Sequence, residues 1–339
     1  MSARCAGTAV LLAAVLLDVT SAALPDPAEW DGYKAAHGKR YGSLQEELRR
    51  MRVYADSKAF VARHNAEFAA GRQTFTVALN RFADLTRDEV NALYSGLRAR
   101  RRGPGPAAGT RRARRPSEPE PPAAVDWRER GVVTPVKDQG QCGSCWAFSS
   151  TGAIESAWAL AGRGLRALSE QQLVDCSAEF FNHGCSGGTM DQAFRYVEAS
   201  GGLMSEEAYP YTAADGGACR AQPSGAAANI TGHVDVMAAG AEPVLAAALA
   251  AVGPISVSID ASQRSFQLYA GGVYSESACS SIWLDHGVLA VGYGAENGTA
   301  FWLVKNSWGA EWGEQGYIRM VRDGTNQCGI ASEAVYPVV

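Results

Sequence analysis

The sequence predicts an α+β protein with two packed subdomains, one helical and one an antiparallel, barrel-like sheet, preceded by a separate helical segment. Helix-forming runs fill residues 44–68 and 145–160, whereas alternating or β-branched runs recur between residues 254 and 321. An arginine- and proline-rich stretch, residues 98–122, separates the first helical run from the rest. Helices that come first and strands that follow argue against a parallel βαβ sheet.

The chain starts with a segment typical of a secretory signal peptide. Arg4 precedes an apolar run from Ala9 to Leu17, and small residues follow up to Ala23. This run is well short of the roughly 20 apolar residues that cross a bilayer. We therefore expect residues 1–23 to be a cleaved signal, no membrane span, and a secretory-pathway protein that is lysosomal or secreted.

Residues 24–97 are expected to form a helical unit. Within Leu44–Phe68, polar and apolar residues recur every three or four positions and so share one helical face. These residues are Glu46, Arg50, Tyr54, Ser57, Val61 and Asn65. The spacing alone also fits an ordinary amphipathic helix. A strand-like run, residues 75–79, and a second helix after Thr86 follow.

Residues 98–122 are expected to be a linker. They hold eight arginines, six prolines and no aliphatic residue larger than Ala, so they cannot bury enough apolar area to fold alone. Residues 24–121 carry 19 Lys and Arg against 12 Asp and Glu, net +7, whereas residues 122–339 carry 11 against 22, net −11. The two parts should attract each other. A protease-accessible hinge is favoured over nucleic-acid binding for the basic run 111–115.

Seven cysteines remain once Cys5 leaves with the signal peptide. In an oxidising compartment they can form three disulfides and must leave one thiol. Cys145 lies at the N-terminal end of a predicted buried helix, a position that lowers the pKa of a thiol. A thioredoxin-like pair with Cys142 would need a βαβ context, and a zinc site would need short paired knuckles. The sequence shows neither, so no metal or cofactor is expected.

A thiolate nucleophile needs a base, and the base needs a group that orients it. Three histidines follow the linker: His183, His233 and His286. His286 begins the most strand-like run, so its ring could project from a rigid sheet. Asn306 could accept a hydrogen bond from that ring, with Trp308 shielding the bond from water.

Three separated segments resemble those of papain-like cysteine proteases: Gln139 to Ser149, Leu284 to Gly287, and Asn306 to Gly309. The resemblance implies a papain-like fold over residues 123–339 and a cysteine endopeptidase acting on proteins and peptides. Cys145 would be the nucleophile, His286 the base and Asn306 its orienting group, with Gln139 stabilising the oxyanion. The implied disulfides are Cys142–Cys185, Cys176–Cys219 and Cys279–Cys328, which leave Cys145 free.

The N-terminal part resembles the inhibitory propeptide of the cathepsin L-like branch. The helical face from Glu46 to Asn65 matches one of its motifs, and Asn80, Phe82 and Asp84 match the other. Four positions depart from the usual residues: Tyr54, Ser57, Val61 and Ala78. The resemblance implies a zymogen whose linker runs through the cleft opposite to substrate, with maturation near residues 121–124. We hypothesise that falling pH weakens the attraction between the two parts by protonating carboxylates.

The same resemblance indicates where substrate binds. Residues expected to line the cleft are Gly187, Gly188, Thr189, Met190, Leu284, Asp285 and Trp308. Counting back from Tyr336-Pro337 places Glu333 at the floor of the S2 pocket, where many relatives have a small or apolar residue. A carboxylate there would accept Arg or Lys as well as Phe or Leu. The alternatives are a glutamate that faces solvent and a simple glycine turn after a disulfide.

The remaining expectations concern modification and partners. Asn229 and Asn297 begin glycosylation sequons. No occluding insertion with paired histidines is visible between Cys185 and Cys219, which favours an endopeptidase over an exopeptidase. A monomer that cystatin-type inhibitors could bind is expected. The alternative is a non-catalytic or protease-inhibitory relative.

Overall fold

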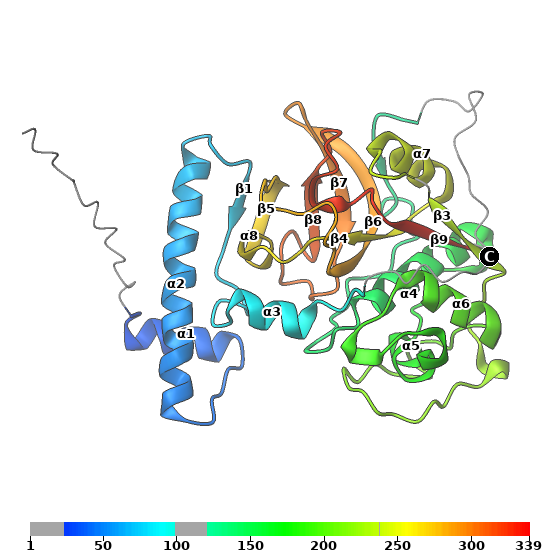
Figure 1. The fold of residues 1–339 in the computed structure, drawn as a ribbon, viewed down its shortest axis with the longest axis horizontal. Coiled ribbons are helices and arrows are strands. Elements are labelled where there is room, and N and C mark those ends of the chain that lie inside the picture. Colours follow the sequence, from blue (N-terminus) through cyan, green and yellow to red (C-terminus); the bar gives the residue numbers. More distant parts are fainter. Residues whose placement is uncertain (1–23, 99–120, 237) are drawn as a thin grey trace, which may run out of the picture.

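The computed structural model describes residues 24–98, 121–236 and 238–339, so the predicted signal peptide and most of the predicted linker lie outside the described residues. The N-terminal part contains α1 (Pro27–Ala36), α2 (Leu44–Ala69), β1 (Phe75–Val77) and α3 (Arg87–Tyr94). These elements lie together along one side of the molecule, and β1 is the one nearest the central sheet (Figure 1).

Side-chain caps define the starts of the N-terminal helices. Asp26 and Ser43 each accept the backbone N–H three residues ahead, at 2.9 and 3.2 Å. Thr86 does the same with Glu89, and Glu89 accepts the backbone N–H of Thr86 at 2.9 Å. This reciprocal capping box satisfies two donors that a helix start would otherwise leave unpaired.

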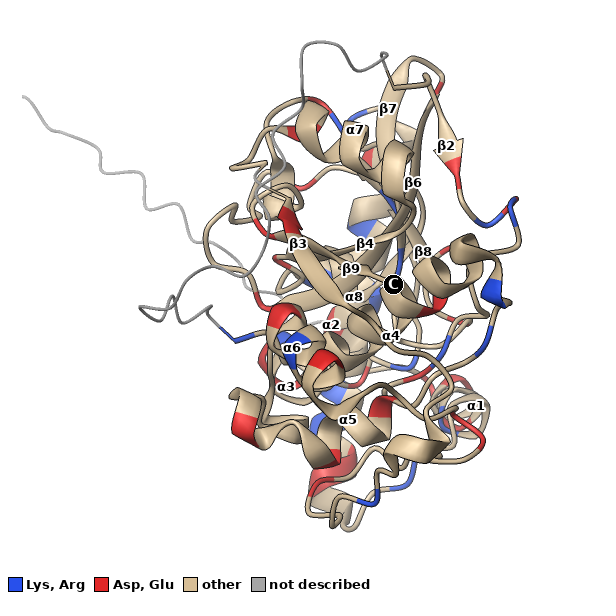
Figure 2. Cartoon of the chain, turned by 90° about the vertical axis from the view of Figure 1, so that its right-hand side faces the viewer, with Lys and Arg blue, Asp and Glu red and all other residues tan. Residues whose placement is uncertain are grey.

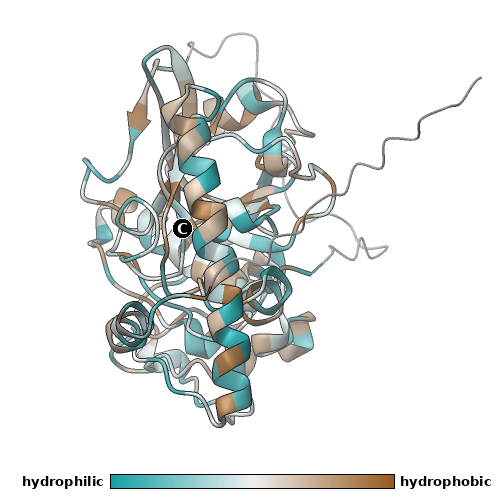
Figure 3. Cartoon of the chain, turned by 90° about the vertical axis from the view of Figure 1, so that its left-hand side faces the viewer, coloured by the Kyte–Doolittle hydropathy of each residue, from teal (hydrophilic) through white to brown (hydrophobic). Residues whose placement is uncertain are grey.

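The evenly spaced residues of α2 lie on one face, as predicted. Tyr54 and Ser57 are buried, and the Ser57 hydroxyl donates to the carbonyl of Ala83 at 2.7 Å. Arg50 donates to Glu46 at 2.9 Å and to Glu89 of α3 at 2.7 Å. Polar and apolar patches alternate along α2 (Figure 3). The face therefore joins α2 to the other N-terminal elements.

Strand β1 attaches the N-terminal part to the sheet of the C-terminal part. It pairs antiparallel with β5 (Tyr269–Tyr274), with Phe75 opposite Gly272. On its other side, the Asn65 amide donates to the Val77 carbonyl at 2.8 Å and accepts from the Val77 N–H at 3.0 Å. The Asn65 amide thereby satisfies the two backbone groups of Val77 that a further strand would otherwise bind. Strand β1 is thus the edge strand of the sheet.

The helical half of the C-terminal part lies below the sheet in Figure 1. Its elements are α4 (Cys145–Trp158), the π-helical turn η1 (Ala159–Arg163), α5 (Glu170–Cys176), the 3-10 turns η2 (Ala178–Phe180) and η3 (Gly184–Ser186), α6 (Met190–Ser200) and the 3-10 turn η4 (Pro223–Gly225). Helices α5 and α6 together carry four acidic residues and one basic residue (Figure 2), and two of the acidic residues, Glu170 and Asp191, are buried.

The sheet half holds most of the strands. Its elements are β2 (Val125–Asp126), β3 (Gly232–Val236), α7 (Glu242–Val252), β4 (Ile255–Ile259), α8 (Arg264–Gln267), β5, β6 (His286–Glu296), β7 (Thr299–Lys305), β8 (Tyr317–Val321), the 3-10 turn η5 (Gln327–Gly329) and β9 (Ala334–Val338). The strand order is β1-β5-β8-β7-β6-β4-β9-β3, with β2 paired to β6.

Two details of this half differ from the expectation. Strands β5 and β8 pair in parallel, whereas the other ladders of the described residues are antiparallel. The expected order of helices first and strands afterwards is wrong in detail, because α7 lies between β3 and β4. The Ala-rich segment Glu242–Val252 starts with Pro243 in its first turn and buries Leu245 and Leu249 against the sheet.

Two apolar cores hold the molecule together. One lies in the sheet half and continues into the N-terminal part through Phe75 and Phe82, and the other lies in the helical half around Trp146. The predicted disulfides Cys142–Cys185, Cys176–Cys219 and Cys279–Cys328 are all formed, and Cys145 is the free, buried thiol. Within residues 24–98, 121–236 and 238–339, no helix is long and apolar enough to cross a membrane.

Candidate active site

An antiparallel hairpin brings His286 and Asn306 together. His286 is the first residue of β6, and Asn306 follows the last residue of β7, its antiparallel neighbour. The start of one strand and the end of its antiparallel neighbour lie at the same end of a sheet. His286 Nε2 and Asn306 Oδ1 are 2.8 Å apart, and both residues are buried.

Helix α4 carries Cys145 to the same place from the helical half. Cys145 is its first residue, where helical N–H groups have no intrahelical acceptor. The helix packs against the sheet through Ser149, whose hydroxyl donates to the Val288 carbonyl at 2.7 Å and whose own carbonyl accepts from Ser256 at 2.9 Å. The backbone N–H of Gly287, next to His286, lies 3.4 Å from the Cys145 sulfur.

The covered site favours uncharged forms of both reactive groups. Burial raises the pKa of Cys145 to about 11, against the backbone N–H groups of Gly287 and Gly96, which favour the thiolate. Burial lowers the pKa of His286 to about 4, against the hydrogen bond to Asn306. Both effects follow from removing charge from water. The thiolate expected from the sequence is thus disfavoured while the site stays covered.

The Trp308 ring packs against the His286 ring and is itself buried. Its ring centroid lies 4.9 Å from that of His286, and the residue is only 1% exposed. Phe82 of the N-terminal part packs edge-on against Trp308 at 5.1 Å, and Tyr94 does so at 6.1 Å. Water is therefore excluded from the His286 and Asn306 pair.

The N-terminal part covers the nucleophile with a glycine. The backbone of Gly96 passes so close to Gly143 that a Cβ at position 96 would lie 1.8 Å from the Gly143 oxygen. No other residue fits there without displacing the chain. Beside it, Gln139 Nε2 donates to the Tyr94 carbonyl and to the Cys142 carbonyl, each at 2.8 Å. The predicted oxyanion donor is thus occupied.

The covering segment pairs with both walls of the cleft. The N–H of Leu97 donates to the Asp285 carbonyl at 3.0 Å, and Gly188 donates to the Gly96 carbonyl at 2.8 Å. Arg98 donates from its backbone N–H to the Gly188 carbonyl at 3.0 Å, so Leu97 and Gly188 form a parallel bridge. Gly188 and its neighbour Gly187 thus both lie next to Gly96.

Leu97 lines the pocket predicted for substrate. Thr189, Met190, Glu333 and Val335 line it, together with Asp191, Ser258 and Ala334. Glu333 is half-buried and accepts a hydrogen bond from the Ser258 hydroxyl at 3.2 Å. Its side chain therefore lines this pocket and is in contact with Ser258.

Asp285 is the most perturbed carboxyl beside the reactive groups. Burial raises its pKa to about 6, against the Ala261 N–H that bonds its Oδ1 at 2.8 Å. Leu284 is half-buried next to it.

The two asparagines that begin glycosylation sequons, Asn229 and Asn297, are both exposed, and Asn297 lies in the tight β6–β7 turn.

Comparison with known proteins places the chain in a family. The model of the papain family of cysteine proteases matches residues 121–338, and that of the cathepsin propeptide inhibitor domain matches residues 30–90. The chain belongs to the papain family of cysteine proteases. It is a cathepsin L-like member made as a proenzyme, so we call residues 24–98 the propeptide region and residues 121–339 the peptidase region.

The relatives agree over almost the whole length. Digestive cysteine proteinase 3 of Homarus americanus is 49% identical and the match covers 97% of this chain and 99% of the relative. Procathepsin L of Rattus norvegicus is 47% identical over 98% and 99%. The structure of digestive procathepsin L 3 of Tenebrio molitor larval midgut has a TM-score of 0.84 and 42% identity over 92% of this chain and 98% of that one. The predicted family and fold are confirmed.

Sequence reasoning missed several residues of the covered site. It did not identify Gly96 or Tyr94, and it did not anticipate the pair of Arg81 with Asp138, which joins the propeptide region to the loop before Gln139. A glycine two residues before the first arginine of the linker was the available signal for Gly96. The Arg81 pair offers no such signal, because its partners are 57 residues apart.

Proposed function

We propose that the processed protein is a cysteine endopeptidase with Cys145 as nucleophile. His286 Nε2–H donates a hydrogen bond to Asn306 Oδ1. The other ring nitrogen, Nδ1, is then unprotonated and can accept the proton of the Cys145 thiol. In support, Nδ1 is a buried ring nitrogen without a hydrogen-bond partner in the described part of the chain. The hydrogen bond between His286 and Asn306 is the observation that carries the proposal.

The reaction follows from these positions. The Cys145 thiolate forms a bond to the scissile carbonyl carbon, and the oxygen takes the negative charge. Gln139 Nε2 and the Cys145 N–H donate to that oxygen once Tyr94 has left. The His286 imidazolium gives its proton to the departing amine, and the same ring then activates water that hydrolyses the acyl-enzyme.

An endopeptidase is favoured because the cleft extends beyond Cys145 on both sides, so a polypeptide can lie across the nucleophile without ending there. The propeptide region enters beside Gln139 and Trp308 at Tyr94 and leaves beside Gly188 at Arg98. A cleft that holds backbone on both sides of the nucleophile can hold an internal peptide bond. The propeptide acts as an intramolecular inhibitor, because Gly96 covers Cys145 and its own peptide bonds are presented in reverse.

Glu333 is proposed to set the preference of the S2 pocket. Leu97 lines this pocket, which supports an aliphatic side chain there, and the Glu333 carboxylate at its wall can accept a hydrogen bond from Arg or Lys. We therefore propose substrates with Leu, Phe, Arg or Lys at this position. Comparison of matched Arg and Leu peptides with wild type and Glu333→Ala tests this assignment.

The remaining assignments concern the export, maturation, localisation and inhibition of the protein. Residues 1–23 are proposed as the signal, 98–122 as the activation segment with cleavage near residues 121–124, and lysosome or secretion as the destination. Three disulfides and two exposed sequon asparagines support export. We also propose a monomer that cystatin-type inhibitors can bind through the open cleft.

A thiol-directed epoxide label tests the catalytic proposal against a non-catalytic relative. Labelling of Cys145 and peptide hydrolysis should both appear when the propeptide is removed, and Cys145→Ala should lose both. A processed protein whose Cys145 reacts no faster than an ordinary exposed thiol, and that hydrolyses no peptide, would contradict the proposal. Reversible pairing of Cys142 with Cys145 would instead indicate a redox exchanger.

A further inference from the structure

Two large apolar side chains stand in solvent just before the histidine segment. Ile282 is 80% exposed and Trp283 is 82% exposed, whereas the other tryptophans of the described residues are buried or half-buried. Exposed tryptophan forfeits a large burial energy, and exposed apolar clusters often mark interaction sites. We call this pair the Ile282–Trp283 surface.

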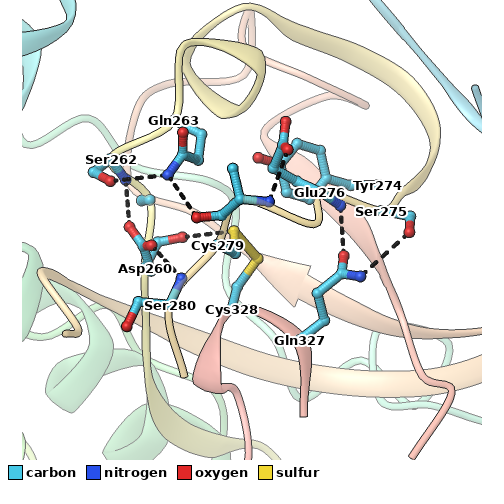
Figure 4. The surroundings of a disulfide bond; sticks show 12 residues. Asp260, Ser262, Gln263, Tyr274, Ser275, Glu276, Cys279, Ser280, Gln327 and Cys328 are labelled. Atoms are coloured by element: carbon cyan, nitrogen blue, oxygen red, sulfur yellow. Dashed lines mark hydrogen bonds between the residues drawn. A yellow bond between two sulfur atoms is a disulfide. The ribbon is translucent and has the colours of Figure 1, made fainter. Parts of the chain in front are cut away.

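The loop that presents this surface is fixed. The disulfide Cys279–Cys328 anchors it, and the Ser280 N–H donates to Asp260 Oδ2 at 2.7 Å next to that disulfide (Figure 4). The Ser280 hydroxyl then accepts the N–H groups of Ile282 and Trp283 at 3.1 and 2.8 Å. A backbone fixed in this way loses little entropy when the side chains bind a partner.

The surface continues into the substrate cleft. Asp285, two residues after Trp283, binds the N–H of Leu97 through its carbonyl. The Ser281 carbonyl accepts from the Ser332 hydroxyl at 2.8 Å, and Ser332 precedes Glu333 of the S2 pocket. The loop therefore forms part of the cleft rim beside the position that Leu97 occupies.

The charge of the surrounding protein indicates which kind of partner could bind the Ile282–Trp283 surface. Residues 122–339 have a net charge of −11, which repels a second copy of the same region and a surface of acidic lipids. Asp260 and Asp285 stand close to the loop. A polypeptide already bound in the cleft has no such barrier, because Gly188 and Asp285 hold its backbone.

We propose that the Ile282–Trp283 surface is a specificity-determining site that binds a large apolar side chain of an extended polypeptide substrate, outside the residue seated in S2. This assignment rests on the proposed function, in which the cleft is the substrate site. It predicts that the enzyme prefers substrates with a bulky apolar residue beyond the S2 position over shorter or more polar ones.

The test compares short and extended substrates with the processed enzyme. The short reporter carries Leu for S2, one further residue and a fluorogenic amide, and the extended quenched peptides add Phe or Ser at each outer position in turn. Trp283→Ala should leave kcat/KM of the short reporter unchanged. It should raise KM about fivefold or more for one Phe-containing extended peptide, with kcat unchanged, because this contact binds ground and transition states alike.

A double cycle identifies the contact. Replacing that Phe by Ser should cause the same loss in wild type and no further loss in Trp283→Ala. The KM of Ile282→Ala for the Phe-containing peptide should lie between that of wild type and that of Trp283→Ala. Leu165→Ala is the matched control, because Leu165 is 38% exposed and follows α4 at the end opposite Cys145.

Three results would overturn the inference. Trp283→Ala could leave every extended peptide unaffected, it could slow short and extended substrates equally, or it could abolish binding to neutral lipid vesicles with no change in any KM. If wild-type enzyme hydrolyses the short reporter, these results count against this surface alone. If wild type hydrolyses neither substrate class, the proposed function fails, and this inference fails with it.

Discussion

Removing the Arg81 side chain should open the proenzyme. Arg81 binds both carboxylate oxygens of Asp138, with Nη2 to Oδ1 at 2.9 Å, and its guanidinium lies 5.1 Å from the Phe82 ring centroid. A hydrogen-bonded charge pair is worth about 1.5 to 3 kcal/mol when shielded. The Asp138 side chain is 42% exposed, so solvent screening reduces this to about 1 to 2 kcal/mol. Arg81→Ala should therefore raise the fraction of open proenzyme about 5- to 30-fold.

Labelling of Cys145 in the intact proenzyme measures this fraction. The labelling rate of the proenzyme, divided by that of the processed enzyme under the same conditions, gives the fraction of molecules in which the site is uncovered. Arg87→Ala is the control, because the Arg87 side chain is exposed and pairs with its neighbour Asp88. High salt should shrink the effect of Arg81→Ala and leave that of Arg87→Ala unchanged.

The pH dependence of this effect has a definite sign. Burial alone would raise the pKa of Asp138, but the Arg81 bonds and the Gly140 N–H outweigh it and hold the pKa below its usual value. The pair therefore stabilises the covered form above about pH 4, and this contribution is lost as pH falls through the depressed pKa. Equal labelling of wild type and Arg81→Ala at pH 7, or a difference that persists undiminished at pH 3, would refute the reasoning.

The other predictions concern the site and the core. Glu333→Ala should lower kcat/KM for an Arg peptide relative to a Leu peptide about tenfold, and an unchanged ratio would exclude a role in S2. Asn306→Ala should lower kcat of the processed enzyme on the order of 10- to 100-fold by releasing His286, while KM barely changes. Asn65→Ala should weaken the docking of β1 by about 1 to 3 kcal/mol and speed labelling of intact proenzyme at neutral pH. Lys137→Met should lower the free energy of unfolding by about 3 to 5 kcal/mol in urea titrations, because it leaves buried carboxylates unpaired.

Local sequence signals predicted much of the fold. The helix start after Thr86, the spacing along α2 and the β-branched runs of β4, β6 and β7 are each encoded within a short stretch of sequence. The parallel pair β5–β8 and the position of α7 were not predicted, because strand pairing and helix packing depend on residues far apart in the chain. The Ala-rich run of α7 gives no helical periodicity to read, since nearly every position is apolar.

The active site likewise has a part that the sequence predicted and a part that it did not. Cys145, His286 and Asn306 could be named because each sits in a recognisable segment, and one hairpin and one helix then bring them together. The state of the site could not be inferred from those segments. The sequence suggested a thiolate nucleophile, whereas the covered site removes both Cys145 and His286 from water and favours their neutral forms.

This burial also bears on how acid could release the propeptide, because the Arg81 pair responds only below about pH 4. Burial lowers the pKa of His286 to about 4, so uncovering lets the ring take up a proton as soon as pH falls toward the ordinary value of about 6.5. Falling pH thus favours the open form through His286 where Cys145 keeps its own proton, because transfer of the thiol proton to the ring takes up no proton from solvent. Burial raises the pKa of Asp285 to about 6, and this acid holds its proton more tightly in the covered form, which opposes release. Above about pH 6 Asp285 is ionised in both forms, so in that range it does not oppose the response of the imidazole.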